Sequence, residues 1–153
     1  MKTKYSLITA ALLLAPCLMQ AQLEVKHIQS DKSPLAAGVW AGETYYMSGQ
    51  LASPISPGEY GDTRAQAASI FAKIQVGLRE QGLEMKDVVK MTVFMGPDPK
   101  TGKMDFAGMQ SEFVKYFGTK EQPNKPARSA FQVAALAAPW ALLEIEVIAV
   151  KSK

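Results

Sequence analysis

The residue best suited to bind an anion is Arg128, in the segment NKPARSAFQVAAL, residues 124–136. It is one of three arginines in the chain and stands at the start of an apolar, strand-like run. A guanidinium stays charged at physiological pH and offers a planar fork of donors that matches a carboxylate. A carboxylate-binding arginine is therefore one interpretation of the segment. The alternative is an arginine at a solvated strand end, paired with Glu144 or Glu146.

Two acidic residues, Glu144 and Glu146, lie in the last apolar run, LLEIEVIAV. Because side chains alternate along a strand, residues two apart share one face of the sheet. A carboxylate beside an electrophilic carbon can take a proton from an attacking water and later return it. The pair is therefore a candidate general base or, as the simpler alternative, part of a solvated strand face.

The sparse cysteine and histidine content excludes several kinds of chemistry. Cys17 is the only cysteine, and it belongs to an N-terminal segment that we expect to be removed. The mature chain would then have no disulfide, no thiol nucleophile and no cysteine metal site. His27 is the only histidine, so a catalytic triad or a histidine zinc site would need it. Its alternation with Val25 indicates an ordinary strand position, and no metal is expected.

The first 21 residues, MKTKYSLITAALLLAPCLMQA, have the pattern of a secretory signal peptide. Two lysines precede an apolar run shorter than the roughly 20 residues that span a bilayer, and Ala21 offers a small residue for cleavage. We therefore expect a periplasmic or secreted protein without a stable membrane anchor. An anchoring N-terminal helix and lipidation at Cys17 are alternatives. Pro16, directly before this cysteine, disfavours lipidation.

The charge balance of the mature chain is close to neutral. Removing Lys2 and Lys4 from the 17 basic residues leaves 15, against 14 acidic residues, a net charge of +1. The charges are interspersed, so no basic surface for nucleic acid is expected. Residues 22–153 have the size and composition of one globular domain.

The first part of the mature chain has the pattern of strands. LEVKHIQ, residues 23–29, alternates weakly between apolar and polar side chains. AAGVWAGETYYMSGQLA, residues 36–52, predicts a hairpin that turns at AGET. A loop rich in proline and glycine follows.

Two helices are predicted further along the chain. In the first, Thr63 and Gln66 fit a capping box, and Gly82 suits a left-handed conformation after the last turn. The second covers MDFAGMQSEFVKYF, residues 104–117. Apolar side chains recur at helical spacing on both: Ala67, Ile70, Phe71, Ile74 and Leu78 on the first, and Phe106, Met109, Phe113 and Phe117 on the second.

Three further strands complete the pattern: DVVKMTVFM between the helices, then ARSAFQVAAL and LLEIEVIAV after the second helix. The strand between the helices alternates, with one apolar face formed by Val89, Met91, Val93 and Met95. This order of elements predicts an α+β domain with both helices on one face of the sheet. The other face would then need a partner, so we expect an oligomer.

Five segments together resemble the Rid family, the reactive intermediate deaminases, also called YjgF-like proteins or L-PSP endoribonucleases. YYMSGQ, GLEMKDVVKMTVFM, MDFAGMQSEFVKYF, PARSAFQVAAL and EIEVIAV occur in the family's order and spacing and span nearly all of residues 22–153. The resemblance implies a chorismate-mutase-like α+β fold, a mixed sheet of about six strands with two helices on one face. It also implies a homotrimer with active sites in the clefts between subunits.

The resemblance further implies the hydrolysis of small 2-imino acids, formed from enamines, to 2-keto acids and ammonia. No metal or organic cofactor is expected, because an imine carbon is already electrophilic and reacts with a positioned water. One alternative is a trimer that binds small carboxylates without turnover. Another is an endoribonuclease, which the single histidine and the low net charge disfavour.

Four residues match the family's site, and a fifth position, Ala130, departs from it. Arg128 corresponds to the arginine of the PARS motif, which grips the substrate carboxylate, and Glu144 to the acidic residue that positions or activates water. Ser48 and Gly49 match the SGQ segment that lines the cleft, where glycine allows close approach of a ligand. Ala130 stands where a cysteine is usual, and only its backbone is expected to touch the substrate.

Besides Ala130, two other residues depart from the family pattern. Leu35 stands where many members have a tyrosine in the cleft, and Gln110 replaces an asparagine in the second helix. Both changes are expected to reshape the substrate pocket. The spacing departs as well, by one extra residue between Arg128 and Glu144. If the loop absorbs it, Glu144 keeps its place; otherwise Glu144 and Glu146 exchange roles.

Overall fold

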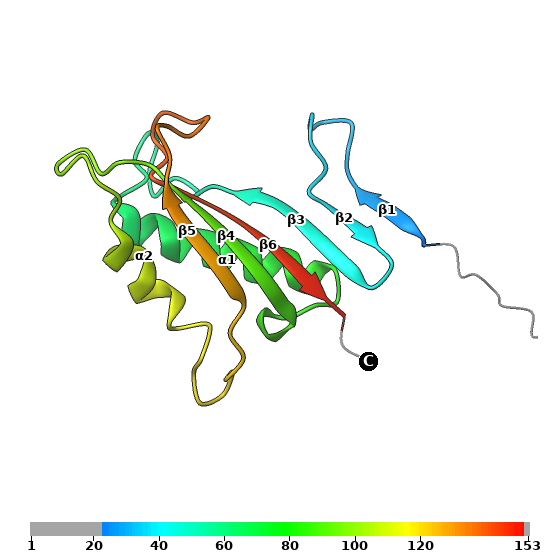
Figure 1. Ribbon diagram of the computed structural model, residues 1–153. Coiled ribbons are helices and arrows are strands. Elements are labelled where there is room, and N and C mark those ends of the chain that lie inside the picture. The colour runs from blue at the N-terminus through cyan, green and yellow to red at the C-terminus, as the bar shows by residue number, and fades with distance from the viewer. Residues whose placement is uncertain (1–22, 152–153) are drawn as a thin grey trace, which may run out of the picture.

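The computed structural model describes residues 23–151 as one α+β unit, a six-stranded sheet with two helices against one face (Figure 1). The predicted signal peptide, residues 1–21, lies outside the described residues, as does Cys17. Within residues 23–151, no helix is long and apolar enough to cross a bilayer. The architecture is the one that the order of elements predicts.

All neighbouring strands are antiparallel except β4 and β5, which run parallel. In sheet order the strands are β1 Val25–Ile28, β2 Gly38–Ala41, β3 Thr44–Gln50, β6 Leu143–Val150, β4 Val88–Met95 and β5 Ala127–Gln132. The last strand, β6, therefore lies between β3 and β4. The helix α2, Phe106–Phe113, lies in the long crossover that a parallel pair requires.

The helix α1, Thr63–Glu80, is capped one residue earlier than predicted. The Asp62 side chain accepts a hydrogen bond from the Ala65 N–H at 2.9 Å, so the predicted capping box of Thr63 and Gln66 is wrong. Aspartate caps as well as threonine and adds a negative charge at the positive end of the helix. Thr63 and Gln66 are buried instead. Gly82 has the predicted left-handed conformation, with a φ of 72°.

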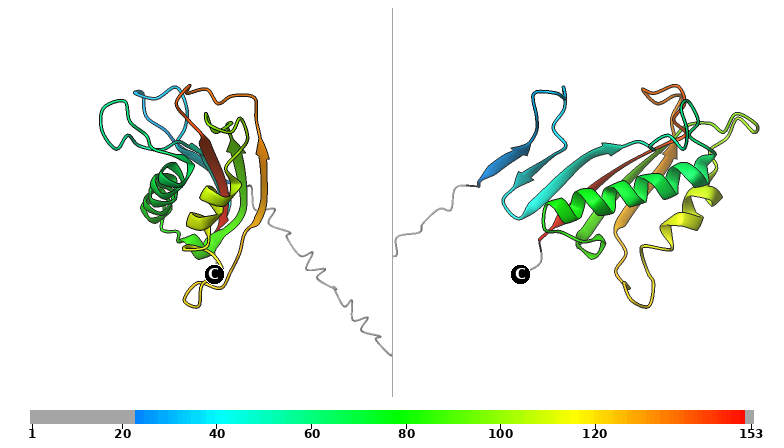
Figure 2. Two further views of the ribbon diagram at one scale, coloured as in Figure 1. Left: turned by 90° about the vertical axis from the view of Figure 1, so that its left-hand side faces the viewer. Right: turned by 180° about the vertical axis from the view of Figure 1, so that it is seen from behind.

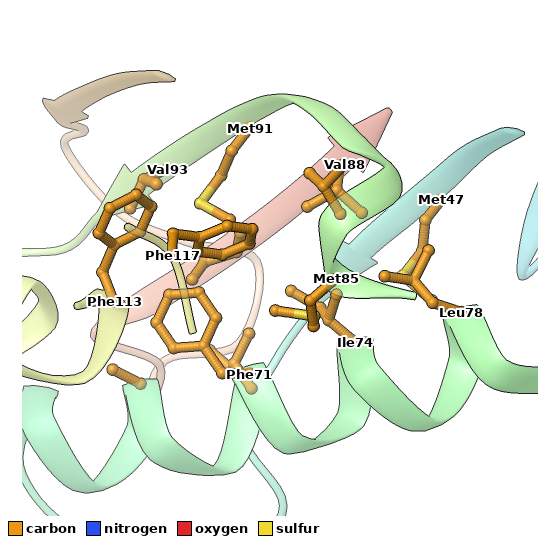
Figure 3. Close-up of a cluster of buried hydrophobic side chains, with 14 of the residues drawn as sticks. Met47, Phe71, Ile74, Leu78, Met85, Val88, Met91, Val93, Phe113 and Phe117 are labelled. Atoms are coloured by element: carbon orange, nitrogen blue, oxygen red, sulfur yellow. The ribbon is translucent and has the colours of Figure 1, made fainter. Parts of the chain in front are cut away.

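The core fills the space between the helices and the sheet (Figure 3). From α1, Phe71, Ile74 and Leu78 point towards Met47, Val88, Met91 and Val93 of the sheet (Figure 3). Phe113 and Phe117 stack at 4.9 Å between ring centroids, and both meet Phe71 edge-on. The helical spacing thus predicts the buried face of α1 correctly, and for α2 it is right at Met109 and Phe113 and wrong at Phe106, which is 40% exposed. Phe117 is buried as predicted, but it follows the end of α2.

One irregularity in β4 is not predicted by alternation. The register between β4 and β6 shifts between Val88 and Lys90. As a result Val88 is buried, and Val89 is 47% exposed. The predicted apolar face is therefore right for Met91, Val93 and Met95 and wrong for Val89. The extra residue at the register shift moves the alternation of buried and exposed side chains by one position at Val88 and Val89.

Both helices lie on the same side of the sheet, and the opposite face is uncovered (Figure 2). Along β6 the fully buried positions alternate with Glu144, Glu146 and Ile148, which belong to the uncovered face. Tyr46 of β3 is 47% exposed, and Phe131 of β5 is 42% exposed. The open face therefore carries apolar side chains together with the two glutamates.

Candidate functional site

The first group of site residues surrounds Glu144, near the start of β6. Its side chain lies over Gly49, at the end of the neighbouring β3: a Cβ atom built on Gly49 would be 2.9 Å from the Glu144 Cδ and closer still to Oε1. Only glycine leaves room for the carboxylate here. The β3–β6 register also shifts between Met47 and Gln50, so the bulge and the close approach occur at the same place.

Ser48 connects this strand to the loop that carries Leu35. The Ser48 hydroxyl donates a hydrogen bond to the Ala36 carbonyl at 2.7 Å, and its backbone N–H donates to the Ala37 carbonyl at 3.1 Å. Leu35, Ser48 and Gly49 line one open cavity of about 410 Å³. The Leu35 side chain is 71% exposed, so it is free to contact a ligand or a second chain.

The environment of Glu144 favours its protonated form. Partial burial raises the pKa of the Glu144 carboxyl, and the nearby Glu146 carboxylate raises it further. A carboxyl with a raised pKa exchanges protons closer to neutral pH than an ordinary glutamate. Glu146 itself is exposed, so of the two acidic residues Glu144 is the one that is partly buried. We name the set Leu35, Ser48, Gly49 and Glu144 the Glu144 half-site.

The second group surrounds Arg128 on β5, on the side of the sheet that α2 covers. The guanidinium carbon lies 4.2 Å from the centre of the Phe113 ring and 5.4 Å from that of Phe106. One of its nitrogens is 4.0 Å from the Met109 sulfur. A guanidinium on aromatic faces is held by cation–π attraction. Apart from the long contact with the Met109 sulfur, its donors have no hydrogen-bond acceptor among residues 23–151.

No carboxylate neutralises Arg128 among residues 23–151: the ion pairs there are Arg64–Glu112, Lys86–Glu84 and Lys115–Glu112. The alternative that Arg128 pairs with Glu144 or Glu146 is therefore wrong for the single chain. Partial burial lowers the pKa of Arg128, but a guanidinium remains charged well above neutral pH. Arg128 is thus a cation held by two aromatic rings, without an ion-pair partner in residues 23–151.

Ala130 lies on the same strand as Arg128, and Gln110 lies on α2, the helix whose Met109 and Phe113 contact Arg128. Ala130 lies two residues along β5 and packs against the core, on the same side of the sheet. Gln110 lies on α2, next to Met109, and its side-chain carbonyl oxygen is buried without a hydrogen-bond partner in the described chain. We name Gln110, Arg128 and Ala130 the Arg128 half-site.

The two half-sites are separate within one chain. In the sheet, Arg128 pairs with Met91 of β4, and Glu144 pairs with Phe94 of β4. Met91 and Phe94 are three residues apart, which is about 10 Å along β4. The strands of Arg128 and Glu144 flank β4, about 10 Å apart, and the side chains of these two residues leave opposite faces of the sheet. Seven predicted site residues therefore form two clusters, and a site with both charges needs more than one copy of the chain.

Two residues that contact Arg128 were not predicted from the sequence as part of the candidate site. Phe106 and Phe113 were predicted only as part of the apolar face of α2, yet both rings support the Arg128 guanidinium. No local signal distinguishes a ring that packs in a core from one that carries a cation. Elsewhere in residues 23–151, no three histidine, cysteine, aspartate or glutamate side chains gather in a way that could hold a metal ion.

The fold belongs to the class of YjgF-type α+β domains, as two solved structures illustrate. The structure of TdcF from Escherichia coli with bound serine is 31% identical, with a TM-score of 0.66 over 83% of this chain and 99% of that one. RidA from an Antarctic Psychrobacter species is 34% identical, with a TM-score of 0.64 over 82% and 99%.

Sequence comparisons give the same result. The family model described as Endoribonuclease L-PSP matches residues 29–151. A RutC family protein of Haemophilus influenzae is 35% identical over 132 residues, 81% of this chain and 95% of its own length. TdcF of Escherichia coli, described as a candidate reactive intermediate deaminase, is 34% identical over 88% and 99%. The chain belongs to this Rid/YjgF/L-PSP family.

Proposed function

We propose that the protein hydrolyses reactive 2-imino and enamino acids to 2-keto acids and ammonia. The observation that carries this proposal is the Arg128 guanidinium, which rests on two phenyl rings and has no carboxylate partner in residues 23–151. A planar cation with free edge donors matches the carboxylate that every such substrate bears. The 2-keto acid product carries the same group.

In this proposal Glu144 supplies the proton transfers. The water oxygen adds to C2 of the imine while Glu144 takes one of its protons, and the C=N bond becomes a single bond whose nitrogen gains a proton. In the resulting carbinolamine Glu144 takes the hydroxyl proton and passes it to the amino nitrogen, a C=O bond forms, and the C–N bond breaks to release ammonia. One water is consumed per imine, and the raised pKa of Glu144 suits a group that both accepts and donates.

The proposal requires an oligomer in which the Arg128 half-site of one copy faces the Glu144 half-site of another. A homotrimer, as the family resemblance implies, would form three such clefts. Support comes from the separation of the two half-sites and from the apolar side chains on the uncovered sheet face, including Tyr46 and Phe131. Light scattering on the purified protein is the direct measurement.

The decisive experiment is ammonia release from freshly generated 2-imino acids. We expect turnover above the buffer rate by the wild type and a loss of about 100-fold or more in Arg128→Ala, because the substrate loses its bidentate anchor. Arg128→Lys keeps the charge without the fork and serves as the matched variant. We expect its activity to lie between those of the wild type and Arg128→Ala.

A second candidate is a protein that captures small carboxylates without turning them over. Leu35 favours it, because this exposed side chain provides no hydroxyl where the family resemblance leads us to expect a tyrosine. Calorimetric binding of 2-keto acids that depends on Arg128, with no ammonia released above the buffer rate, would establish this candidate and exclude the deaminase.

We also propose that residues 1–21 are removed after export to the periplasm or the medium. The support is the sequence pattern alone: two lysines, a short apolar run and Ala21. Mass spectrometry of the protein purified from cell fractions tests it. A cytoplasmic protein that retains Met1–Ala21 would contradict the proposal.

A further inference from the structure

Gln66 is a buried polar residue in the first turn of α1, with 1% of its surface exposed. Its amide nitrogen donates to the Trp140 carbonyl at 3.2 Å and to the Gly61 carbonyl at 3.3 Å. Its amide oxygen accepts from the Leu142 N–H at 2.9 Å. The side chain therefore connects the start of α1 to the segment directly before β6.

The residues 140–142 are also held from two other directions. The Gly96 N–H, just after β4, donates to the Leu142 carbonyl at 3.0 Å. A Cβ atom on Gly96 would lie 3.1 Å from the Ala141 carbonyl oxygen, so this close approach favours glycine. The Tyr60 ring stacks on Trp140 at 3.5 Å with 7° between the planes. Contacts from Gln66, Gly96 and Tyr60 therefore hold residues 140–142 in place.

The register of β6 decides which carboxylate reaches Gly49. Glu144 follows two residues after Leu142, and side chains alternate strictly along a strand. A slip of one residue would turn Glu144 towards the core and Leu143 outwards, and a slip of two would bring Glu146 to Gly49. The loop before β6 has one more residue than the commoner family pattern, so loop length alone does not specify this register.

We propose that Gln66 is a positioning residue that fixes the start of β6 and thereby holds Glu144, rather than Glu146, over Gly49. Its catalytic consequence rests on the proposed deaminase function. The geometry selects Gln66 because its amide binds both the carbonyl of Trp140 and the N–H of Leu142. If the segment before β6 moved by one residue relative to α1, both hydrogen bonds would be lost.

The test compares Gln66→Leu with Gln122→Leu in the full chain. Gln122 is a matched control, because its amide also makes three hydrogen bonds in a loop, to Tyr116 and Asn124. We expect Gln66→Leu to lower kcat by about 10- to 100-fold while KM stays within about twofold, since Arg128 is untouched. Gln122→Leu should keep kcat within about twofold. Equal kcat losses in the two variants would overturn the positioning role.

Gln66→Asn covers the case in which the leucine variant does not fold. Its amide is one methylene shorter and cannot reach both Trp140 and Leu142. We expect a smaller loss of kcat than in Gln66→Leu, again without a change in KM. A folded Gln66→Asn with the kcat of the wild type would contradict the proposal.

A second measurement does not depend on turnover. The carboxyl of Glu144 can be titrated by ¹³C NMR, and in the wild type burial raises its pKa. If Gln66 holds Glu144 in place, the Gln66 variants should shift this pKa down towards the ordinary glutamate value, and Gln122→Leu should not. This shift in a protein that releases no ammonia would support the positioning role and refute the deaminase. An unchanged titration in an active enzyme would refute the positioning role alone.

Discussion

At Arg128 the orientation of a charged side chain comes from aromatic rings. An acidic partner would fix the guanidinium equally well, but it would occupy the donors that a ligand needs. Phe106 and Phe113 hold the plane of the group and leave its edge free. The exposed position of Phe106, which is anomalous for a core residue, is explained by this contact.

Glu146 affects the protonation of Glu144 through its charge. Its carboxylate contributes to the raised pKa of Glu144, so Glu146→Gln should lower that pKa. A general base works in its ionised form, above its pKa, and the rising limb of the pH–rate profile should therefore move to lower pH. Measurement of kcat/KM for ammonia release against pH checks this.

The matched change, Glu144→Gln, should remove the rising limb of the pH–rate profile and lower the activity by about 100-fold or more. If Glu146→Gln has the larger effect on kcat, the two residues exchange roles, as the extra loop residue allows in principle.

At the scale of elements, one buried carboxylate joins the two helices. Glu112 of α2, with 5% of its side chain exposed, pairs with Arg64 of α1 at 3.0 Å and with Lys115 at 2.6 Å. The hydrogen bond from Lys115 is the largest cause of its lowered pKa, and Arg64 adds to it. Because α2 also carries Phe113, this connection bears on the support of Arg128.

We expect Glu112→Gln to lower the free energy of unfolding by about 1–2 kcal/mol at pH 7, since a charge-assisted hydrogen bond is lost and the two cations are largely exposed. A lowered pKa adds stability above the unfolded-state value, and this stability is lost as pH falls through the folded-state value. The difference in the free energy of unfolding between Glu112→Gln and the wild type should therefore shrink below about pH 4. Urea unfolding at pH 7 and pH 3 measures it. An equal difference at both values would contradict this assignment.

Local patterns in the sequence predict most of the helices and strands, because these elements depend mainly on residues that are close together in the chain. The buried face of α1 and the alternation of Met91, Val93 and Met95 follow from periodicity alone. The bulge at Val88 and the helix cap at Asp62 could not be predicted from local patterns, since two adjacent residues suit each role equally well. The motif resemblance identifies the candidate site residues.

Their placement in two half-sites could not be derived in that way. The face to which Arg128 points depends on the parallel pairing of β5 with β4 and on the position of α2, which are tertiary features. Likewise the choice between Glu144 and Glu146 depends on contacts from Gln66, far away in the sequence.

At the scale of the whole molecule, complementation tests whether one cleft uses two chains. Arg128→Ala and Glu144→Gln should each be inactive alone. After joint refolding in equal amounts, about a quarter of the clefts in random trimers would combine an intact Arg128 with an intact Glu144. Ammonia release should return to about that fraction of the wild-type rate. No recovery in mixed oligomers confirmed by mass spectrometry would place both residues in one chain's site.

The open face of the sheet is the expected contact surface. Tyr46→Lys, on that face, should produce monomers and abolish activity, because a charge would be buried without a partner. Val76→Lys is the matched control: Val76 is an apolar residue of similar exposure, 55%, on α1 at the helical side. We expect it to leave the oligomer intact. Sedimentation of both variants provides the comparison, and an intact oligomer in Tyr46→Lys would remove this face as the interface.

The division of the site between two sheet faces has a consequence for how the protein responds to its own concentration. An active centre that exists only at a boundary between copies forms and disappears by mass action, so the activity per chain would fall on dilution even though every chain stays folded. Such a catalyst would be active where it accumulates and inactive where it is sparse, without any regulatory ligand.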